Sequence, residues 1–285
     1  MDGTDGMYSI KKDGFIELTL GDWLSRVARF YPDNDAVVNV SRGTRLSYAE
    51  LEAKAHEVAK GLIAAGVKKD NKVVIWATNY PEWLYLLFGC AKIGAILVTV
   101  NTNYKIFELE YLLRQSDAMS LFFIKGQKDT DYVSIVRELT GISSGESSLG
   151  IDCPRLPYLK NLVYIPHDSS DAVPEGFTSW ENSLAGGKTV DDETLNAIER
   201  GLDCHEIINM QYTSGTTGFP KGVMLTHYNI LNNGYYIGEN MKFSPSDRLC
   251  ITVPLFHCFG LVLATMASLT HASTMVLVDA FRPSE

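Results

Sequence analysis

The sequence lacks any arrangement of cysteines that suits a metal site or a disulfide framework. Its 285 residues include an odd number of cysteines, and these are dispersed at positions 90, 153, 204, 250 and 258. We therefore expect reduced thiols, mostly in the core, and no metal ligands. The acidic, polar N-terminus does not resemble a signal peptide, so we predict a cytoplasmic protein, with peripheral membrane association as an alternative.

The sequence also lacks an excess of basic residues. It has 25 Lys and Arg against 34 Asp and Glu, which gives a formal net charge of −9. This balance argues against a nucleic-acid partner. Any anionic ligand must therefore be held by a local group of donors rather than by the field of the whole protein.

Uninterrupted apolar runs long enough to cross a membrane are missing as well. Residues 83–100 are apolar but carry Lys92 and Gly94, which divide them into a helix and a strand. Residues 250–278 contain no charged residue other than histidine, yet Pro254 and several Ser and Thr keep each apolar stretch short. We read this segment as strand, helix and strand in a core, and predict no transmembrane segment.

What the sequence does contain is an alternation of strand-like and helix-like segments. Ser47 and Glu50 form a capping box that opens a helix, and Gly66 suits its end. Further helices are expected from Pro81 and over 107–114, 131–139 and 190–199, and strands over 72–77, 96–100 and 121–124. This rhythm predicts an α/β fold with largely parallel sheets flanked by helices.

Two polar segments punctuate the alternation. Residues 142–150 and 166–176 read as loops, and the second is the best candidate for an internal boundary. We therefore predict an N-terminal extension over 1–17, a first α/β lobe over 18–165 and a second lobe over 166–285. The sequence shows no internal repeat.

Residues 212–222 are the most informative segment, reading Tyr-Thr-Ser-Gly-Thr-Thr-Gly-Phe-Pro-Lys-Gly between two apolar, strand-like runs. Its glycines can take positive φ and let the backbone approach a ligand, and successive N–H groups in such a turn can bind an anion. Hydroxyl and ammonium groups add further donors. The segment therefore predicts a polyphosphate-binding loop made by Thr213, Ser214, Gly215, Thr216, Thr217, Gly218 and Lys221.

Two other interpretations of this loop were weighed. The Walker P-loop requires glycine before the lysine and a helix after it, whereas Lys221 precedes Gly222 and an extended segment. A Ser/Thr/Gly-rich surface hairpin without function would also have this composition, although the specific string makes that reading the weaker one.

The string resembles the phosphate-binding signature of the adenylate-forming superfamily, which includes acyl-CoA synthetases, firefly luciferase and nonribosomal peptide adenylation domains. Three further segments resemble motifs in the family's order: residues 46–51, residues 92–95 with 101–104, and residues 254–260, which read Pro-Leu-Phe-His-Cys-Phe-Gly. The resemblance runs from about residue 18 to the end and is greatest to a fatty acyl-CoA synthetase. It implies an incomplete N-terminal domain of the acyl-CoA synthetase/luciferase-like fold.

The resemblance also implies motifs that residues 1–285 do not contain. Family members continue with an adenine-contacting Tyr-Gly-x-Thr-Glu motif, whose glutamate helps to hold Mg²⁺, and with a ribose-binding aspartate. A hinge and a small C-terminal domain with a catalytic lysine follow. We therefore expect this chain to be the first part of such an enzyme, with its Mg²⁺ ligand outside the chain, and not to turn over ATP by itself.

The activity implied by the resemblance is ATP-dependent activation of a fatty or similar carboxylic acid through an acyl adenylate, followed by thioester formation with CoA. His257 would be the catalytic residue against the substrate carboxylate, and Gly260 and Leu261 would border the acyl chain. The alternatives are a core histidine packed beside phenylalanines and a glycine that permits close helix packing.

Two other functions remain open at this stage. The acceptor could be a carrier protein instead of CoA, because the residues that would select the thiol lie outside the chain. The chain could also be a non-catalytic fragment that binds a nucleotide or an acyl group. Acyl chain length and oligomeric state are not encoded in any feature of these residues.

Overall fold

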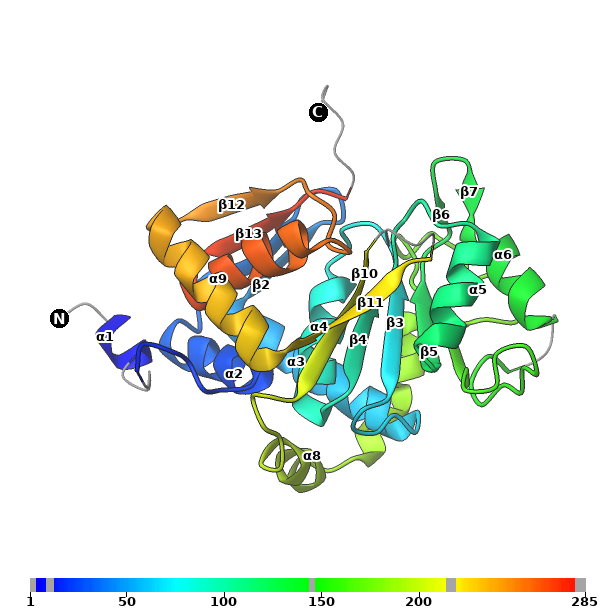
Figure 1. Cartoon of the computed structure of the whole chain (residues 1–285), viewed down its shortest axis with the longest axis horizontal. Helices are drawn as coiled ribbons and strands as arrows, with labels where there is room; N and C mark the ends of the chain where they lie inside the picture. The colour runs from blue at the N-terminus through cyan, green and yellow to red at the C-terminus, as the bar shows by residue number, and fades with distance from the viewer. Residues whose placement is uncertain (1–3, 9–12, 144–146, 214–218, 280–285) are drawn as a thin grey trace.

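The computed structural model describes residues 4–8, 13–143, 147–213 and 219–279, which form two main sheets with helices around them (Figure 1). The larger sheet has seven strands, in the order β11 (Lys221–Thr226), β10 (Ile207–Thr213), β4 (Ile96–Thr99), β3 (Lys72–Trp76), β5 (Ala118–Phe123), β8 (Asn161–Tyr164) and β9 (Thr178–Ser179). All neighbours in it pair in parallel except β11, which pairs antiparallel with β10.

The smaller sheet has four strands, in the order β12 (Arg248–Ile251), β13 (Thr274–Leu277), β1 (Asp35–Asn39) and β2 (Thr44–Ser47). Only β2 is antiparallel to its neighbour. A short hairpin, β6 (Gly126–Gln127) and β7 (Thr130–Asp131), stands apart from both sheets. The prediction of an α/β fold with largely parallel sheets is therefore confirmed.

The helices cover the sheets and fill the space between them. Their bounds are α1 (Thr4–Met7), α2 (Leu20–Phe30), α3 (Tyr48–Ala64), α4 (Glu82–Ile93), α5 (Ile106–Gln115), α6 (Tyr132–Thr140), α7 (Trp180–Leu184), α8 (Asp192–Glu199), α9 (His227–Met241) and α10 (Ala267–Thr270). A 3₁₀ turn, η1 (Ala185–Thr189), follows α7, and a π-helix, η2 (Phe259–Met266), precedes α10.

The local signals in the sequence produce the elements they predict. Ser47 caps α3 through the predicted capping box with Glu50, and Gly66 has a φ of 82° after the helix ends. Pro81 immediately precedes α4, where its fixed φ and missing N–H cost nothing. Residues 250–278 form strand, helix and strand, as expected. Among the described residues, no helix combines the length and apolar character that crossing a membrane requires.

Both main sheets contain strands from either side of the predicted boundary between residues 165 and 166. In the smaller sheet, β1 pairs in parallel with β13, and in the larger one β4 pairs in parallel with β10. Each main sheet therefore draws strands from both sides of that boundary. The predicted extension is also packed against the rest, because Met7 and Ile16 are buried.

One smaller expectation, that most cysteines lie in the core, is wrong. All five cysteines are unpaired, but only Cys90 and Cys153 are buried, while Cys250 and Cys258 are exposed. Most of the cysteines are therefore not core residues.

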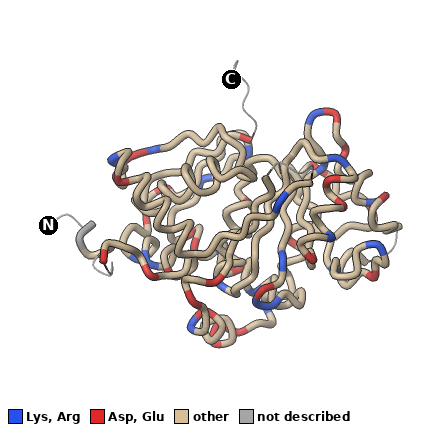
Figure 2. Tube along the Cα trace, in the orientation of Figure 1, with Lys and Arg blue, Asp and Glu red and all other residues tan. Residues whose placement is uncertain are grey.

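Acidic and basic residues are interspersed along the described part of the chain, and no basic stripe is present on it (Figure 2).

A buried lysine ties four helices together in the layer beside the larger sheet. Lys92 on α4 is 2 % exposed, and its Nζ lies 2.8 Å from carboxylate oxygens of both Glu52 on α3 and Glu199 on α8. It also donates to Ser25 Oγ on α2, at 3.3 Å. Burial alone lowers the pKa of Lys92, but the two carboxylates outweigh it and raise the pKa above the ordinary lysine value, so the ammonium stays charged.

Replacing Lys92 by methionine should destabilise the protein by about 3 kcal/mol, because two carboxylates would lose their buried partner. The matched control is Lys54→Met on α3, whose ion pair with Glu57 is half exposed and should contribute less than about 1 kcal/mol. Urea unfolding of both variants measures the difference. Equal losses would mean that the buried network does not hold the helices together.

Candidate active site

A cleft lies where the carboxyl ends of strands from both sheets meet, which is the usual ligand position in parallel α/β sheets. Its volume is about 560 Å³. The residues that line it follow β3, β4, β12 and β13 or belong to the β6–β7 hairpin: Ala77, Thr78, Asn79, Thr102, Asn103, Gln127, Lys128, Thr252, Val253, Pro254, Phe256 and Asp279. Among the described residues of this lining, Lys128 is the only Lys or Arg and Asp279 the only carboxylate.

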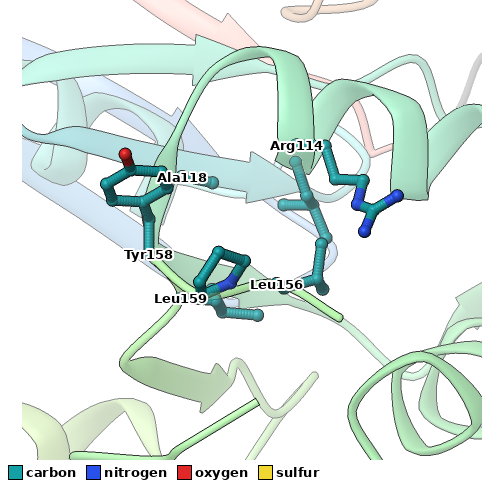
Figure 3. A pocket seen from close by; sticks show the side chains of 7 residues that line it. Arg114, Ala118, Leu156, Tyr158 and Leu159 are labelled. Carbon is teal, nitrogen blue, oxygen red and sulfur yellow. The ribbon is translucent and has the colours of Figure 1, made fainter. Parts of the chain in front are cut away.

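A second hollow, of about 180 Å³, lies at the opposite edge of the larger sheet (Figure 3). It includes Ala118, the first residue of β5, and is therefore at an amino end rather than a carboxyl end. Leu113, Leu156 and Leu159 give it an apolar wall, with Tyr158 beside them. It brings together none of the residues predicted for function, so the carboxyl-end cleft is the better candidate.

The predicted phosphate loop begins at the same edge as the cleft. Thr213 is the last residue of β10 and pairs with Lys221, the first of β11, so the two ends of the loop are held side by side. The Tyr111 hydroxyl on α5 donates to Pro220 O at 3.3 Å, and the Tyr111 and Phe219 rings stack at 5.3 Å. The two strand-like runs expected on either side of the loop are thus confirmed as β10 and β11, with Thr213 and Lys221 both exposed.

The central residues of that loop, Ser214, Gly215, Thr216, Thr217 and Gly218, lie outside the described residues. Their role in phosphate binding stays a prediction. Just before them, Gln211 is buried on β10, and its Nε2 has no hydrogen-bond partner among the described residues. A buried amide donor therefore lies two residues before the loop begins.

Asn79, which follows β3, joins the two sheets at the cleft. Its side-chain Nδ2 donates to Val253 O at 2.9 Å, and its Oδ1 accepts from Leu255 N at 2.9 Å. Its backbone N–H donates to Asp279 O at 3.3 Å. The side chain is 4 % exposed. Asn79 at the end of β3 therefore fixes the segments that follow β12 and β13.

A second bond holds the same turn against the larger sheet. Thr99 Oγ1 at the carboxyl end of β4 donates to Phe256 O at 3.0 Å. Thr99 is also the register partner of Gln211 on β10. The strand that leads into the phosphate loop and the turn that carries His257 therefore both border the end of β4.

His257 is exposed, so the interpretation as a core histidine is wrong for this structure. Its Nδ1 accepts from the Phe259 backbone N–H at 3.1 Å. A neutral ring that accepts at Nδ1 carries its proton on Nε2, which makes Nε2 a donor. His257 is next to the cleft-lining Phe256 but is not itself among the lining residues. The π-helix η2 starts two residues later, and such helices are frequent at functional sites.

Gly260 and Leu261 were predicted to border the acyl chain, but both are buried and neither lines the cleft. A Cβ atom built on Gly260 would lie 2.3 Å from Pro254 O and 2.8 Å from Pro254 C. The absence of a side chain thus lets η2 approach the backbone of the 254–255 turn. This packing accounts for the glycine without an acyl chain, and the acyl role of both residues stays a prediction.

Comparison with known protein families gives one match, the AMP-binding enzyme family, over residues 24–285. The chain belongs to the AMP-binding enzyme family. Among its relatives, YngI of Bacillus subtilis, provisionally named as an acyl-CoA synthetase, is 44 % identical over 94 % of this chain. The mitochondrial medium-chain acyl-CoA ligase ACSF2 of Macaca fascicularis is 34 % identical over 94 % of it. The chain spans 48 % and 43 % of these two relatives.

Solved structures share the fold of this family member. A Mycobacterium tuberculosis fatty acyl CoA synthetase superposes with a TM-score of 0.71 at 20 % identity, over 93 % of this chain and 45 % of the other. The anthranilate CoA ligase AuaEII, solved in complex with anthranoyl-AMP, superposes with a TM-score of 0.72 at 22 % identity. That match covers 99 % of this chain and 47 % of AuaEII.

Replacing Asn79 by aspartate should destabilise the protein by about 2 kcal/mol, because an acceptor would face Val253 O where a donor is needed. Backbone amides over 253–260 should exchange hydrogen faster, as measured by mass spectrometry. Asn71→Asp is the control, since Asn71 uses only its oxygen, which accepts from Lys68 N at 2.8 Å. Unchanged exchange over 253–260 in Asn79→Asp would contradict a positioning role for this side chain.

Replacing Gly260 by alanine should destabilise the protein by about 1–3 kcal/mol through overpacking against the Pro254 backbone. Gly201→Ala is the matched control, because its added Cβ would meet nothing closer than 3.4 Å. Thermal unfolding of both variants makes the comparison. A Gly260→Ala protein as stable as Gly201→Ala would argue against the packing explanation.

Proposed function

We propose that this chain is the N-terminal part of an enzyme that activates a fatty or similar carboxylic acid with ATP and transfers the acyl group to CoA. The single observation that carries the proposal is that two segments of the predicted site border the carboxyl end of β4. The phosphate loop leaves from the neighbouring β10, and the turn with His257 is bonded to Thr99. A nucleotide phosphate and a substrate carboxylate could therefore meet at this edge.

The proposed reaction asks for positioning more than for proton transfer. A carboxylate is ionised at neutral pH, so its oxygen can attack the α-phosphorus of ATP without a general base. The new bond is a mixed carboxylic–phosphoric anhydride bond, and the bond between the α-phosphorus and the pyrophosphate oxygen breaks. The barrier lies in bringing two anions together and in stabilising the charge that develops on pyrophosphate, which preorganised donors do best.

In this proposal the loop supplies those donors at the phosphates. Residues 213–218 provide hydroxyl and backbone N–H groups, and Lys221 provides a charge at the exposed start of β11. His257 provides an Nε2–H donor for the substrate carboxylate, with its ring fixed by the Phe259 N–H. Lys128 adds the one positive charge of the cleft lining, where anionic substrates need it.

A magnesium ion, expected with ATP in this family, has no evident carboxylate ligand at the cleft. Asp279 is the only acidic residue of the described lining, and its Oδ1 already accepts from Asn39 Nδ2 at 2.6 Å. The described residues of the cleft therefore do not fit the ion, and the expectation that its ligand lies outside this chain stays a prediction. No step of the proposal is routed through the metal.

CoA is the proposed acceptor because relatives more than 30 % identical are named as acyl-CoA ligases. A carrier-protein acceptor is the alternative within the family, and a non-catalytic binding fragment is the alternative outside it. The five unpaired thiols support a cytoplasmic setting for any of the three. Purified residues 1–285 should form no acyl-CoA from ATP, fatty acid and CoA, whereas the complete protein should.

Loop variants of the complete protein should lose adenylation, measured as fatty acid-dependent exchange of pyrophosphate into ATP. Thr217→Ala and Lys221→Ala each remove one donor, so each should lower the rate roughly 10²–10³-fold, or about 2–4 kcal/mol. Gly215→Val and Gly218→Val should block the close approach of backbone to phosphate and have at least as large an effect.

The control is Lys188→Ala, an exposed lysine on η1 away from the cleft, which should leave exchange unchanged. Exchange at the unaltered rate in all four loop variants would mean that residues 213–221 form only a surface hairpin. Adenylation without acyl-CoA formation in the unaltered protein would instead favour a carrier-protein acceptor.

A further inference from the structure

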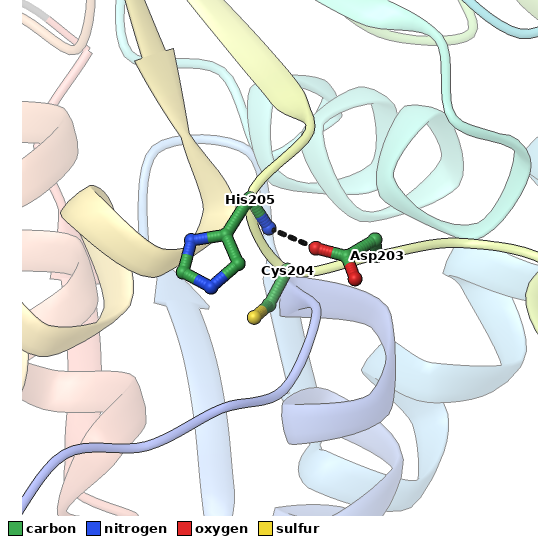
Figure 4. A group of neighbouring side chains, drawn as sticks. All are labelled: Asp203, Cys204 and His205. Atoms are coloured by element: carbon green, nitrogen blue, oxygen red, sulfur yellow. Dashed lines mark hydrogen bonds between the residues drawn. The ribbon is translucent and has the colours of Figure 1, made fainter.

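Three consecutive side chains with metal-binding atoms converge in the turn between α8 and β10. Asp203, Cys204 and His205 each offer one ligand atom, and these atoms all lie within 4.8 Å of one another (Figure 4). The turn is remote in sequence from His257, and none of the three residues lines the cleft. Prediction from cysteine spacing missed it because the ligands are adjacent residues of different types rather than a paired motif.

The backbone of this turn is fixed on both sides. Cys204 O accepts from Tyr228 N at 2.8 Å, and Asp203 O accepts from Glu206 N at 3.1 Å. Within the turn, Asp203 Oδ1 accepts from the His205 backbone N–H at 2.7 Å, which orients the carboxylate and leaves Oδ2 for another partner. Hydrogen bonds of this kind preorganise ligand groups in metal sites.

The side chains themselves are available to a cation. Among the described residues, the His205 ring makes no hydrogen bond or ion pair, and it lies beside the Tyr228 ring, at 4.9 Å between centroids. The Cys204 thiol is half-buried. The Asp203 carboxylate lies beside this thiol and supplies a negative charge, which attracts a cation.

We propose that Asp203, Cys204 and His205 bind a divalent transition metal of the Zn²⁺ class. A thiolate, an imidazole nitrogen and a carboxylate oxygen are the donors that Zn²⁺ prefers, whereas Mg²⁺ and Ca²⁺ prefer oxygen alone. Bonds of about 2.0–2.3 Å place tetrahedral ligand atoms roughly 3–4 Å apart, so small side-chain rotations close the observed spacing. The fourth position is open to water.

A bound metal would hold three parts of the chain together. The turn connects α8 to β10, and Tyr228 N ties it to the start of α9. Binding is balanced by release of the Cys204 proton, because the thiolate rather than the thiol is the ligand. A metal that binds only the folded state stabilises it by an amount that grows with the logarithm of the free metal concentration relative to Kd. This inference is independent of the proposed catalytic function.

The test uses untagged residues 1–285, freed of metal and titrated with Co²⁺ and then with Zn²⁺. We expect a thiolate-to-Co²⁺ charge-transfer band that saturates at one equivalent and is abolished by Zn²⁺. Cys204→Ser should abolish the band. Because losing an outer-sphere partner of a metal already costs about 10–100-fold in affinity, Cys204→Ser and His205→Gln should each weaken Zn²⁺ binding at least roughly tenfold.

Cys250→Ser is the matched control, since Cys250 is an exposed thiol on β12 and should leave the band intact. Thermal unfolding in the presence of a chelator checks that all three variants fold. Added Zn²⁺ should then raise the unfolding temperature of the unaltered protein and of Cys250→Ser, but not that of Cys204→Ser or His205→Gln. The absence of a charge-transfer band would overturn the proposal. A band that survives Cys204→Ser but not Cys250→Ser would overturn it equally.

Discussion

The side chain of Asn79 is the contact on which the geometry of the cleft depends. It lies at the end of β3 in the seven-stranded sheet, yet its amide binds backbone atoms of Val253 and Leu255, which follow β12 in the other sheet. An amide offers a donor and an acceptor on two separate atoms of one short side chain, so it can bind both backbone groups at once. Because parallel strands put their carboxyl ends at one edge, a single short side chain can join two sheets there.

The rest of the frame keeps that junction rigid. Lys92 fixes α4 against α2, α3 and α8 through buried charges, and α4 is the helix that connects β3 to β4. The ends of these two strands carry Asn79 and Thr99, which hold the turn before His257. The ion-pair network on α4 and the cleft at the ends of β3 and β4 therefore belong to the same βαβ unit.

Membership of the AMP-binding enzyme family and the position of the cleft support each other but rest on different evidence. The family follows from the match over residues 24–285, whereas the cleft follows from where β3, β4, β12 and β13 end. The chain spans less than half of the relatives compared here. The described cleft has one lysine and one engaged aspartate, which is sparse for two anionic substrates and a divalent cation. The proposed reaction therefore needs groups beyond the described lining of the cleft, such as those of the predicted phosphate loop.

The sequence by itself determined the local elements and the family. Capping at Ser47, proline before α4 and apolar alternation act over a few residues, so they can be read from the chain, and the loop string alone suggested adenylate formation. The sequence did not determine the pairing of β1 with β13 or of β4 with β10, which crosses the expected boundary. Such pairing depends on which buried faces fit together across long sequence separations.

Tertiary structure alone also decided the roles of individual residues at the site. The side chain of Asn79 links the two sheets, and Gly260 allows η2 to approach the Pro254 backbone, although neither contact can be recognised from the neighbouring sequence. Asp203, Cys204 and His205 had no recognisable spacing, yet a turn brings their ligand atoms together. Each role depends on partners that are distant in sequence or on the direction of a side chain, and neither is encoded in residue type and order within a short window.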